Sequence, residues 1–449
     1  MDIKLSDHFT YKKLLRFTLP SVMMMLFSSV YGVVDGFFIS NYVGAVPFAA
    51  VNLIMPFLML LAIFGFMFGT GGSALVAMLL GQGKPKRAKG IFSFLVYVLI
   101  GAGSILAGLG MIFLPEVSRM LGASEDMLPY CVLYGRIVLL SLVPFMLQIS
   151  FENYLVAAEN PKLGLYTTLA AGCTNMVLDA LLVGYLSMGV TGAALATCVS
   201  ETIGGLIPLM YFILPNRGPL RLGKPYVSLR YLWRAASNGI SEFVSSLSMS
   251  FVSILYNFQL MVLAGENGVA AYGIIMYVDF MFMALFIGYS IGVSPVVSYQ
   301  YGARNHTEVR SVLKKSLAVI GAAGFVLTVA AETLAYPLAG IFVSYDAELL
   351  ELTAHGFRLY SLAFLLCGFN MFGSAFFTAL NNGMVSAVIS CGRTLICESA
   401  AVLLLPMLLG SDGIWLAIVV AEIMALLMTL YFFMKHRERY HYDWWVKES

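Results

Sequence analysis

The chain has 449 residues, of which 60% are hydrophobic and only 11% are charged. Soluble domains carry roughly 25% charged residues, so this composition excludes an ordinary soluble enzyme or binding domain. The net charge of +2 is not gathered in a separate basic domain, which argues against nucleic-acid binding. We therefore expect an integral membrane protein.

Apolar runs recur along the whole chain, and many reach the roughly 20 residues that a helix needs to cross a bilayer. Twelve spans are predicted, in chain order: 14–40, 48–80, 91–115, 128–158, 162–186, 190–214, 232–263, 268–299, 311–338, 349–380, 384–410 and 412–435. Several contain proline or exceed the needed length, so bends and tilt are expected. The predicted fold class is an all-α polytopic membrane protein.

The basic residues fall on alternate sides of these spans. With the N-terminus in the cytoplasm, 22 of the 26 lysines and arginines lie in cytoplasmic segments, while outer loops carry acids such as Glu125 and Asp346. This asymmetry follows the positive-inside rule. It predicts a multi-pass protein of the cell membrane with both termini cytoplasmic, surrounded by lipid and working as a monomer.

A shift of 221 residues lays the second half of the chain on the first. The matched pairs are Ala49–Ala270, Ala50–Ala271, Gly71–Gly292, Ser73–Ser294, Ala158–Ala379, Asn160–Asn381, Gly189–Gly410, Gly192–Gly413 and Glu201–Glu422. Six spans per repeat is an even number, so both halves keep the same orientation, as in parallel-repeat transporters. We predict six-helix lobes at 1–214 and 232–436, a cytoplasmic linker at 215–231 and a cytoplasmic tail at 437–449.

Polar residues inside the spans of the first half suggest an ion site. Asn175 and Asp179 are four residues apart in the fifth span and share one face. Asp35 in the first span and Thr197 in the sixth are their natural companions. Acids in lipid are expensive and are functional by default. Carboxylate, amide and hydroxyl oxygens suit Na⁺ as ligands, and two carboxylates that repel each other equally suit a shared proton.

The cation- or proton-coupling site is thus predicted at Asp35, Asn175, Asp179 and Thr197. The competing interpretation is that these groups only form hydrogen bonds that hold helices together. Elsewhere, the repeat partners Glu201 and Glu422 are expected to have structural or gating roles. Arg393 lies in mid-span and is expected to pair with an acid such as Glu398.

Short motifs then point to a family. They are Leu19-Pro20 and Val34-Asp35 in the first span, Ala49-Ala50-Val51 and Gly69-Thr70-Gly71 in the second, the loop Gly81–Ala88 with its counterpart Tyr301–Arg304, and the turn Ala158-Glu159-Asn160-Pro161. Over essentially its whole length, the chain resembles multidrug and toxic compound extrusion (MATE) transporters. The resemblance implies an H⁺- or Na⁺-coupled antiporter that exports amphipathic, often cationic organic compounds by alternating access.

The resemblance also bears on single residues. In the branch whose amino-terminal lobe holds the coupling ion, the family has an Asp in helix 1, an Asn and an Asp four apart in helix 5, and a Thr in helix 6. Asp35, Asn175, Asp179 and Thr197 fit those places. Pro20 supplies a bend about which helix 1 can move.

The second half departs from the family pattern. Ser241 stands where the repeat would match Pro20. Another branch has acids where this chain has Met249 and Asn370, which favours the amino-terminal lobe as the ion site. The candidate residues of the substrate cavity are Glu242, Asp279, Asn370 and Met249.

The sequence fits three rival functions less well. A lipid-linked saccharide flippase or polysaccharide exporter shares the architecture but favours a strongly basic cavity, whereas acids predominate among the charges within these spans. A membrane enzyme is disfavoured because the chain has no H-E-x-x-H, nucleophile elbow or phosphate loop. An ion channel is disfavoured because the halves have no filter-like loop. We expect no enzymatic activity, and no cofactor beyond the coupling ion.

Overall fold

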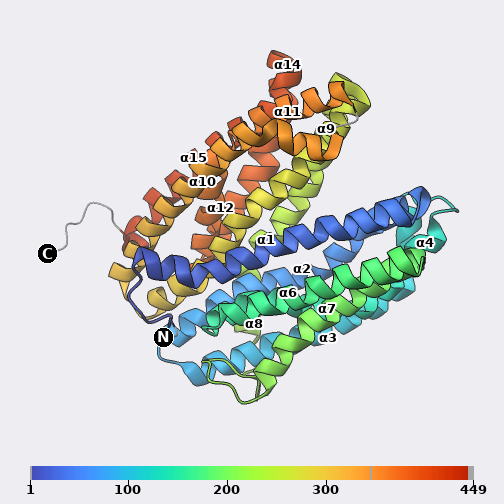
Figure 1. Ribbon diagram of the computed structural model, residues 1–449. Helices are drawn as coiled ribbons and strands as arrows, with labels where there is room; N and C mark the ends of the chain where they lie inside the picture. Colours follow the sequence, from blue (N-terminus) through green and yellow to red (C-terminus); the bar gives the residue numbers. More distant parts are fainter. Residues whose placement is uncertain (1–2, 344–345, 443–449) are drawn as a thin grey trace.

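The computed structural model describes residues 3–343 and 346–442, and its secondary structure there is helical. The first lobe contains α1 (Tyr11–Tyr42), α2 (Ala45–Gly81), α3 (Pro85–Met120), α4 (Leu128–Leu140), α5 (Leu142–Ala157), α6 (Pro161–Leu178), the π-helical η1 (Asp179–Tyr185) and α7 (Gly189–Ile213). The second contains α8 (Leu229–Asn238), α9 (Ile240–Gly302), α10 (His306–Val343), α11 (Ala347–Ser361), α12 (Phe364–Ala379), α13 (Gly383–Cys391), the π-helical η2 (Gly392–Glu398), α14 (Ser399–Leu409) and α15 (Ser411–Tyr440). Figure 1 shows the two lobes joined at one end and diverging at the other.

The described helices make twelve crossings, six in each lobe. The pairs α4–α5 and α11–α12 are bent by 56° and 52°, and each pair forms one crossing. Eleven candidate spans result when each bent pair counts once, and dividing α8–α9 at Gly265 makes twelve, because the backbone there leaves the helical region at φ 63° and ψ −153°. The predicted twelve-helix fold is confirmed. The predicted lobe boundary between residues 231 and 232 falls inside α8.

The internal repeat is visible in the backbone. Three turns with positive φ recur 221 residues apart, at Gly44 and Gly265, Gly83 and Arg304, and Gly189 and Gly410. A positive φ is a strained position for most residues, so its recurrence shows that both halves follow the same path. The parallel repeat predicted from sequence is confirmed.

The repeat shifts by one residue around the turn after α5. Asn160 caps α6 by accepting a hydrogen bond from the N–H of Leu163, and Asn382 caps α13 by accepting one from Val385. The sequence pairing of Asn160 with Asn381 is therefore wrong by one position. The physical reason is one extra residue at the bend of the second lobe, where two residues separate α11 from α12 and one separates α4 from α5.

The lobes touch through closely packed backbone at the joined end. A Cβ atom on Gly81 of α2 would lie 2.0 Å from the carbonyl oxygen of Tyr299, and one on Gly302 of α9 would lie 2.1 Å from that of Met78. Gly81 and Gly302 are repeat partners, so α2 and the end of α9 cross near the axis that relates the lobes. Only glycine allows so close an approach.

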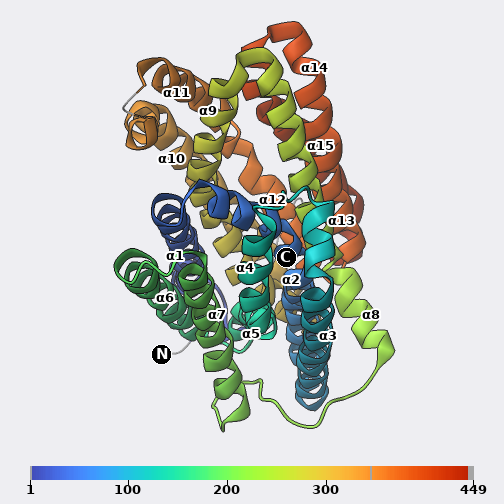
Figure 2. The ribbon, with the colours of Figure 1, turned by 90° about the vertical axis from the view of Figure 1, so that its right-hand side faces the viewer.

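A connecting segment, residues 214–228, follows α7 and leads to α8 (Figure 2). It is held against α3, because the N–H of Tyr226 donates to the carbonyl of Gly90 at 2.9 Å and the N–H of Gly223 donates to the hydroxyl of Ser93 at 3.0 Å. Leu220 is fully buried. The predicted linker thus packs on the first lobe.

Candidate cation-binding site

The site is positioned by the contact between α1 and α6. A Cβ atom on Gly172 of α6 would lie 2.5 Å from the ring of Phe27 and 2.8 Å from that of Tyr31 on α1, so glycine lets the two helices pack tightly here. Asp35 lies one turn beyond Tyr31. Asp179 lies about two turns beyond Gly172, at the point where α6 becomes the π-helical η1. Such π-helical segments are frequent at functional sites.

The structure brings three of the four predicted residues directly together. The carboxyl group of Asp35 interacts with the side chains of both Asp179 and Asn175. Asp179 is fully buried and Asn175 is 3% exposed, while Asp35 is partly accessible. Two carboxyl groups thus face each other away from bulk water, where their mutual repulsion is poorly screened.

Thr197 of α7 lies near the same group. The hydroxyl of Tyr134, which donates to the sulfur of Met55 at 3.9 Å, lies near Thr197, Asp35 and Asp179. Thr197 also lines a small cavity of about 20 Å³ together with Glu201 and Met55. The hydroxyl of Tyr134 is therefore the group that lies near both Thr197 and the two acids.

The oxygens of these residues have unused hydrogen-bonding capacity. Within residues 3–343 and 346–442, fourteen buried side-chain nitrogen or oxygen atoms have no hydrogen-bond partner, and five belong to the four predicted residues. They are Asp35 Oδ1, Asn175 Oδ1, both carboxylate oxygens of Asp179, and Thr197 Oγ1. Buried polar atoms are normally paired, and an exception requires an explanation. A set of carboxylate, amide and hydroxyl oxygens fits a Na⁺ ion or a proton shared between carboxylates.

Sequence reasoning missed three hydroxyl groups near this site. Tyr31 and Tyr134 both lie within electrostatic range of Asp35 and Glu201. Ser141, at the bend between α4 and α5, donates a hydrogen bond of 2.6 Å to the carboxylate of Glu201. Tyrosine and serine are common inside membrane helices, so their types alone gave no signal. The Tyr31–Asp35 spacing of four residues was the one usable clue.

The second lobe also buries acids, but a base lies among them. Arg393 donates to Oε1 of the fully buried Glu422 at 2.7 Å, and Asn370 donates to Oε2 of Glu422 at 2.7 Å. Sequence reasoning expected Arg393 to pair with an acid such as Glu398, its neighbour on the same helix. The hydrogen-bonded partner is Glu422 of α15, and Glu398 interacts with Arg393 only electrostatically.

The four predicted cavity residues do not form one group. Asn370 is buried, and its amide is bonded to Glu422 and to the hydroxyl of Thr429. Asp279 lies near Arg393 and interacts with Tyr360. Met249 is 64% exposed on α9, and Glu242 lies in the first turn of α9. A substrate role for these four stays a prediction.

Pro20 lies within the part of α1 that packs on α9, because Thr18 before it and Val22 after it both contact that helix. A Cβ atom on Gly292 would lie 2.9 Å from Thr18, and one on Gly288 would lie 2.6 Å from Val22. Further along α1, Phe27 and Tyr31 pack on α6 of the first lobe. Proline removes a backbone donor inside a helix and weakens it locally.

Comparisons with known proteins give the family. The family model described as MatE matches residues 20–181 and 243–400, which is more than half of the chain and includes both repeats. The chain belongs to the MatE family. It is 24% identical over 442 residues to the multidrug export protein MepA of Staphylococcus aureus strain MSSA476, with 96% of this chain and 95% of that protein covered.

Two further matches agree with this assignment. MepA of Staphylococcus haemolyticus is 26% identical over 445 residues, again with 96% and 95% coverage. A solved structure of an outward-facing multidrug resistance MATE family transporter superposes with a TM-score of 0.91 at 20% identity, covering 97% of this MatE chain and 98% of its own. The fold is therefore that of MATE transporters, with twelve helices in two lobes.

Proposed function

We propose that this protein is a cation-coupled antiporter that exports amphipathic or cationic organic compounds by alternating access. The observation that carries the proposal is the group of five unpartnered oxygens contributed by Asp35, Asn175, Asp179 and Thr197. The names of the staphylococcal relatives, multidrug export proteins, support the substrate class. They do not favour the rival function of a lipid-linked saccharide flippase.

The coupling follows from the electrostatics of the group. Binding of H⁺ or Na⁺ between Asp35 and Asp179 removes the repulsion between the carboxylates and lets α1 close on α6. Release of the ion restores the repulsion and drives the helices apart. Such an ion shifts the equilibrium between conformations only by its difference in affinity for them. With the termini in the cytoplasm, as we propose, the divergent end of the molecule faces outward.

Pro20 is the proposed hinge for this movement. Residues on both sides of Pro20 contact the second lobe, and the later part of α1 carries Asp35 against the first lobe, so a bend near Pro20 transmits ion binding to the interface between lobes. A hinge needs only a few residues that absorb the change in backbone angles.

Proteoliposomes test the proposal. Efflux of a fluorescent organic cation is measured with an imposed pH gradient and, separately, with an imposed Na⁺ gradient. We expect one gradient to drive transport by the wild type, and Asp35→Asn and Asp179→Asn to lose that dependence. Glu116→Gln, which changes an exposed acid of the same lobe, is the matched control and should behave as the wild type. Unchanged gradient dependence in both aspartate variants would remove them from the coupling role.

A further inference from the structure

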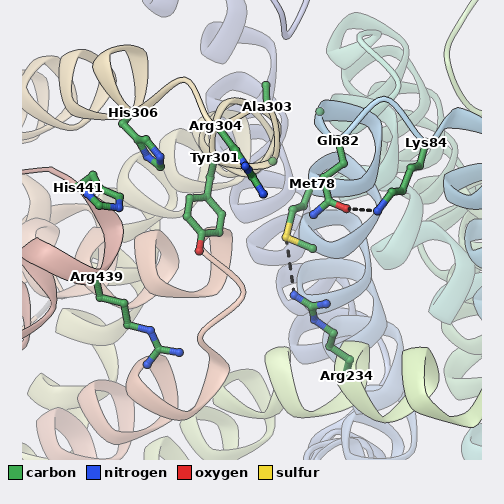
Figure 3. Close-up of a pocket in the computed structure, with 12 residues that line it drawn as sticks. Met78, Gln82, Lys84, Arg234, Tyr301, Ala303, Arg304, His306, Arg439 and His441 are labelled. Atoms are coloured by element: carbon green, nitrogen blue, oxygen red, sulfur yellow. Dashed lines mark hydrogen bonds between the residues drawn. The ribbon is translucent and has the colours of Figure 1, made fainter.

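A large basic pocket lies at the joined end of the molecule, away from the candidate cation site. Its volume is about 810 Å³. Both lobes line it, with Gln82 and Lys84 following α2 in the first lobe and Arg304 and His306 at the α9–α10 turn in the second (Figure 3). Arg234 of α8 and Arg439 and His441 at the end of α15 complete the ring of basic side chains. We refer to this cavity as the basic pocket.

The charges of the basic pocket are uncompensated. Its lining includes Lys84, Arg234, Arg304, Arg439 and two histidines but no aspartate or glutamate. In the described part of the chain, no salt bridge involves a lining residue. Lys13, near the start of α1, by contrast pairs with Asp7 at 2.7 Å.

The partners that these side chains do have are weak and neutral. Lys84 contacts the amide oxygen of Gln82 at 3.2 Å, and Arg234 contacts the sulfur of Met78 at 3.7 Å. Arg439 lies over the ring of Tyr440, 5.5 Å from its centre. An arginine or lysine held only by such contacts keeps most of its capacity to bind an oxyanion.

The two histidines add donors to the same cavity. The rings of His306 and His441 are 4.6 Å apart, and Nδ1 of His306 is buried without a hydrogen-bond partner among the described residues. The Figure 3 view places both rings on the side of the pocket opposite Lys84. Burial and the neighbouring charges of His441 and Arg304 lower the pKa of His306, and a multiply charged anion in the pocket would relieve the repulsion between these groups.

We propose that the basic pocket binds a phosphate-bearing anion that bridges the two lobes. The shared chemistry is a diphosphate or phosphodiester group, which can belong to an anionic lipid headgroup or to a soluble phosphate compound. Basic pockets at the cytoplasmic ends of membrane helices are suited to such groups. Because its walls come from both lobes, a bound anion stabilises the conformation in which the ends of α2 and α9 are packed together.

Purified full-length transporter provides the first test. Melting is followed with increasing inorganic pyrophosphate at constant ionic strength, and the dissociation constant is measured by calorimetry. Each Lys or Arg removed should weaken binding roughly fivefold, so Lys84→Gln/Arg304→Gln/Arg439→Gln should weaken it about 100-fold. The matched control is Lys162→Gln/Arg217→Gln/Lys224→Gln, which removes the same charge from exposed sites outside the pocket and should bind as the wild type. The three single variants keep the test valid if the triple variant does not fold.

Native mass spectrometry of the same proteins tests whether the bound anion is a lipid headgroup. Retention of phosphatidylglycerol over phosphatidylcholine by the wild type and the control, but not by the pocket variants, assigns the site to a lipid headgroup. Saturable pyrophosphate binding without lipid preference assigns it to a soluble phosphate compound. Equal behaviour of pocket and control variants in both arms would overturn the proposal, and neither assay depends on transport activity.

Discussion

Glu201 and Glu422 occupy equivalent positions in the two lobes, yet their surroundings differ. Glu422 is fully buried and is hydrogen-bonded to Arg393 and Asn370. Glu201 accepts a hydrogen bond from the neutral hydroxyl of Ser141, and the nearby Asp35 and Asp179 form no salt bridge in the described part of the chain. The two repeats thus have the same helices, but the equivalent glutamates have different charged and polar neighbours. Acids without a base can load and release a cation, whereas acids bonded to arginine hold helices together.

The largest expected effect breaks the pair of the second lobe. Arg393→Met should lower the free energy of unfolding by about 3–5 kcal/mol, because it leaves Glu422 buried and unpaired. Thermal melting in detergent measures the loss. Adding Glu422→Gln to Arg393→Met should recover part of the lost stability. The control is Arg358→Met, which replaces an exposed arginine and should change stability by only about 0.5 kcal/mol or less. Equal melting of the Arg393 and Arg358 variants would contradict a structural role for the pair.

The next effect concerns the hinges of the two lobes. Pro20 lies inside the continuous helix α1, while in the second lobe α8 and α9 are separated at Gly239, two residues before Ser241, the repeat partner of Pro20. Pro20→Ala should raise the stability of α1 by up to about 3 kcal/mol and slow substrate efflux, because the helix then resists bending. Pro208→Ala, in α7, is the control and should leave the efflux rate unchanged. Faster or equal efflux by Pro20→Ala would exclude the hinge.

In the first lobe, we expect removal of an acid to increase stability by a small amount, the opposite of its effect in the second lobe. Asp35→Asn should raise the free energy of unfolding, by on the order of 1 kcal/mol, because it removes the repulsion between two buried carboxylates. Glu422→Gln should instead lower it, because Arg393 loses its partner. Melting temperatures of the two variants, measured side by side, decide the comparison. A loss of stability in both would mean that the acids of the first lobe are structural as well.

The smallest expected effect concerns the pH dependence of stability and two acids outside the membrane-spanning segments, Asp7 and Glu159. Burial raises the pKa of Asp7, but the hydrogen bond and charge of Lys13 outweigh it, so its pKa lies below the usual value. Burial also raises the pKa of Glu159, and the N–H of Leu5, which donates to it at 2.8 Å, only partly offsets this, so its pKa lies above the usual value.

The sign of the pH dependence follows from these directions. A carboxyl group whose pKa is raised by folding favours the folded state fully below the unfolded value of about 4.3, and the contribution is lost as the pH rises through the folded value. Glu159→Gln should therefore reduce the loss of stability on raising the pH through this range. Melting temperatures across that range, with the wild type in parallel, measure it. An unchanged profile would contradict the assignment.

Much of the fold could be predicted from the sequence, because membrane helices must satisfy their own backbone and must be long and apolar. The twelve crossings and the repeat followed from the apolar runs and from pairs such as Gly189 and Gly410. The bends at Ser141 and Leu362, the π-helical start at Asp179 and the one-residue shift at Asn382 could not be predicted. They depend on how neighbouring helices pack, which no local pattern encodes.

The sequence by itself determined which polar residues stand inside the membrane, since their cost in lipid makes them conspicuous. Only the tertiary structure decided which of them meet. In the folded chain, Asp35 lies beside Asn175 and Asp179 because α1 and α6 pack closely at Gly172. Arg393 is hydrogen-bonded to Glu422 and not to Glu398. Basic residues from distant segments line one pocket. Contacts between helices depend on crossing positions and side-chain directions, and these are fixed only when the whole chain packs.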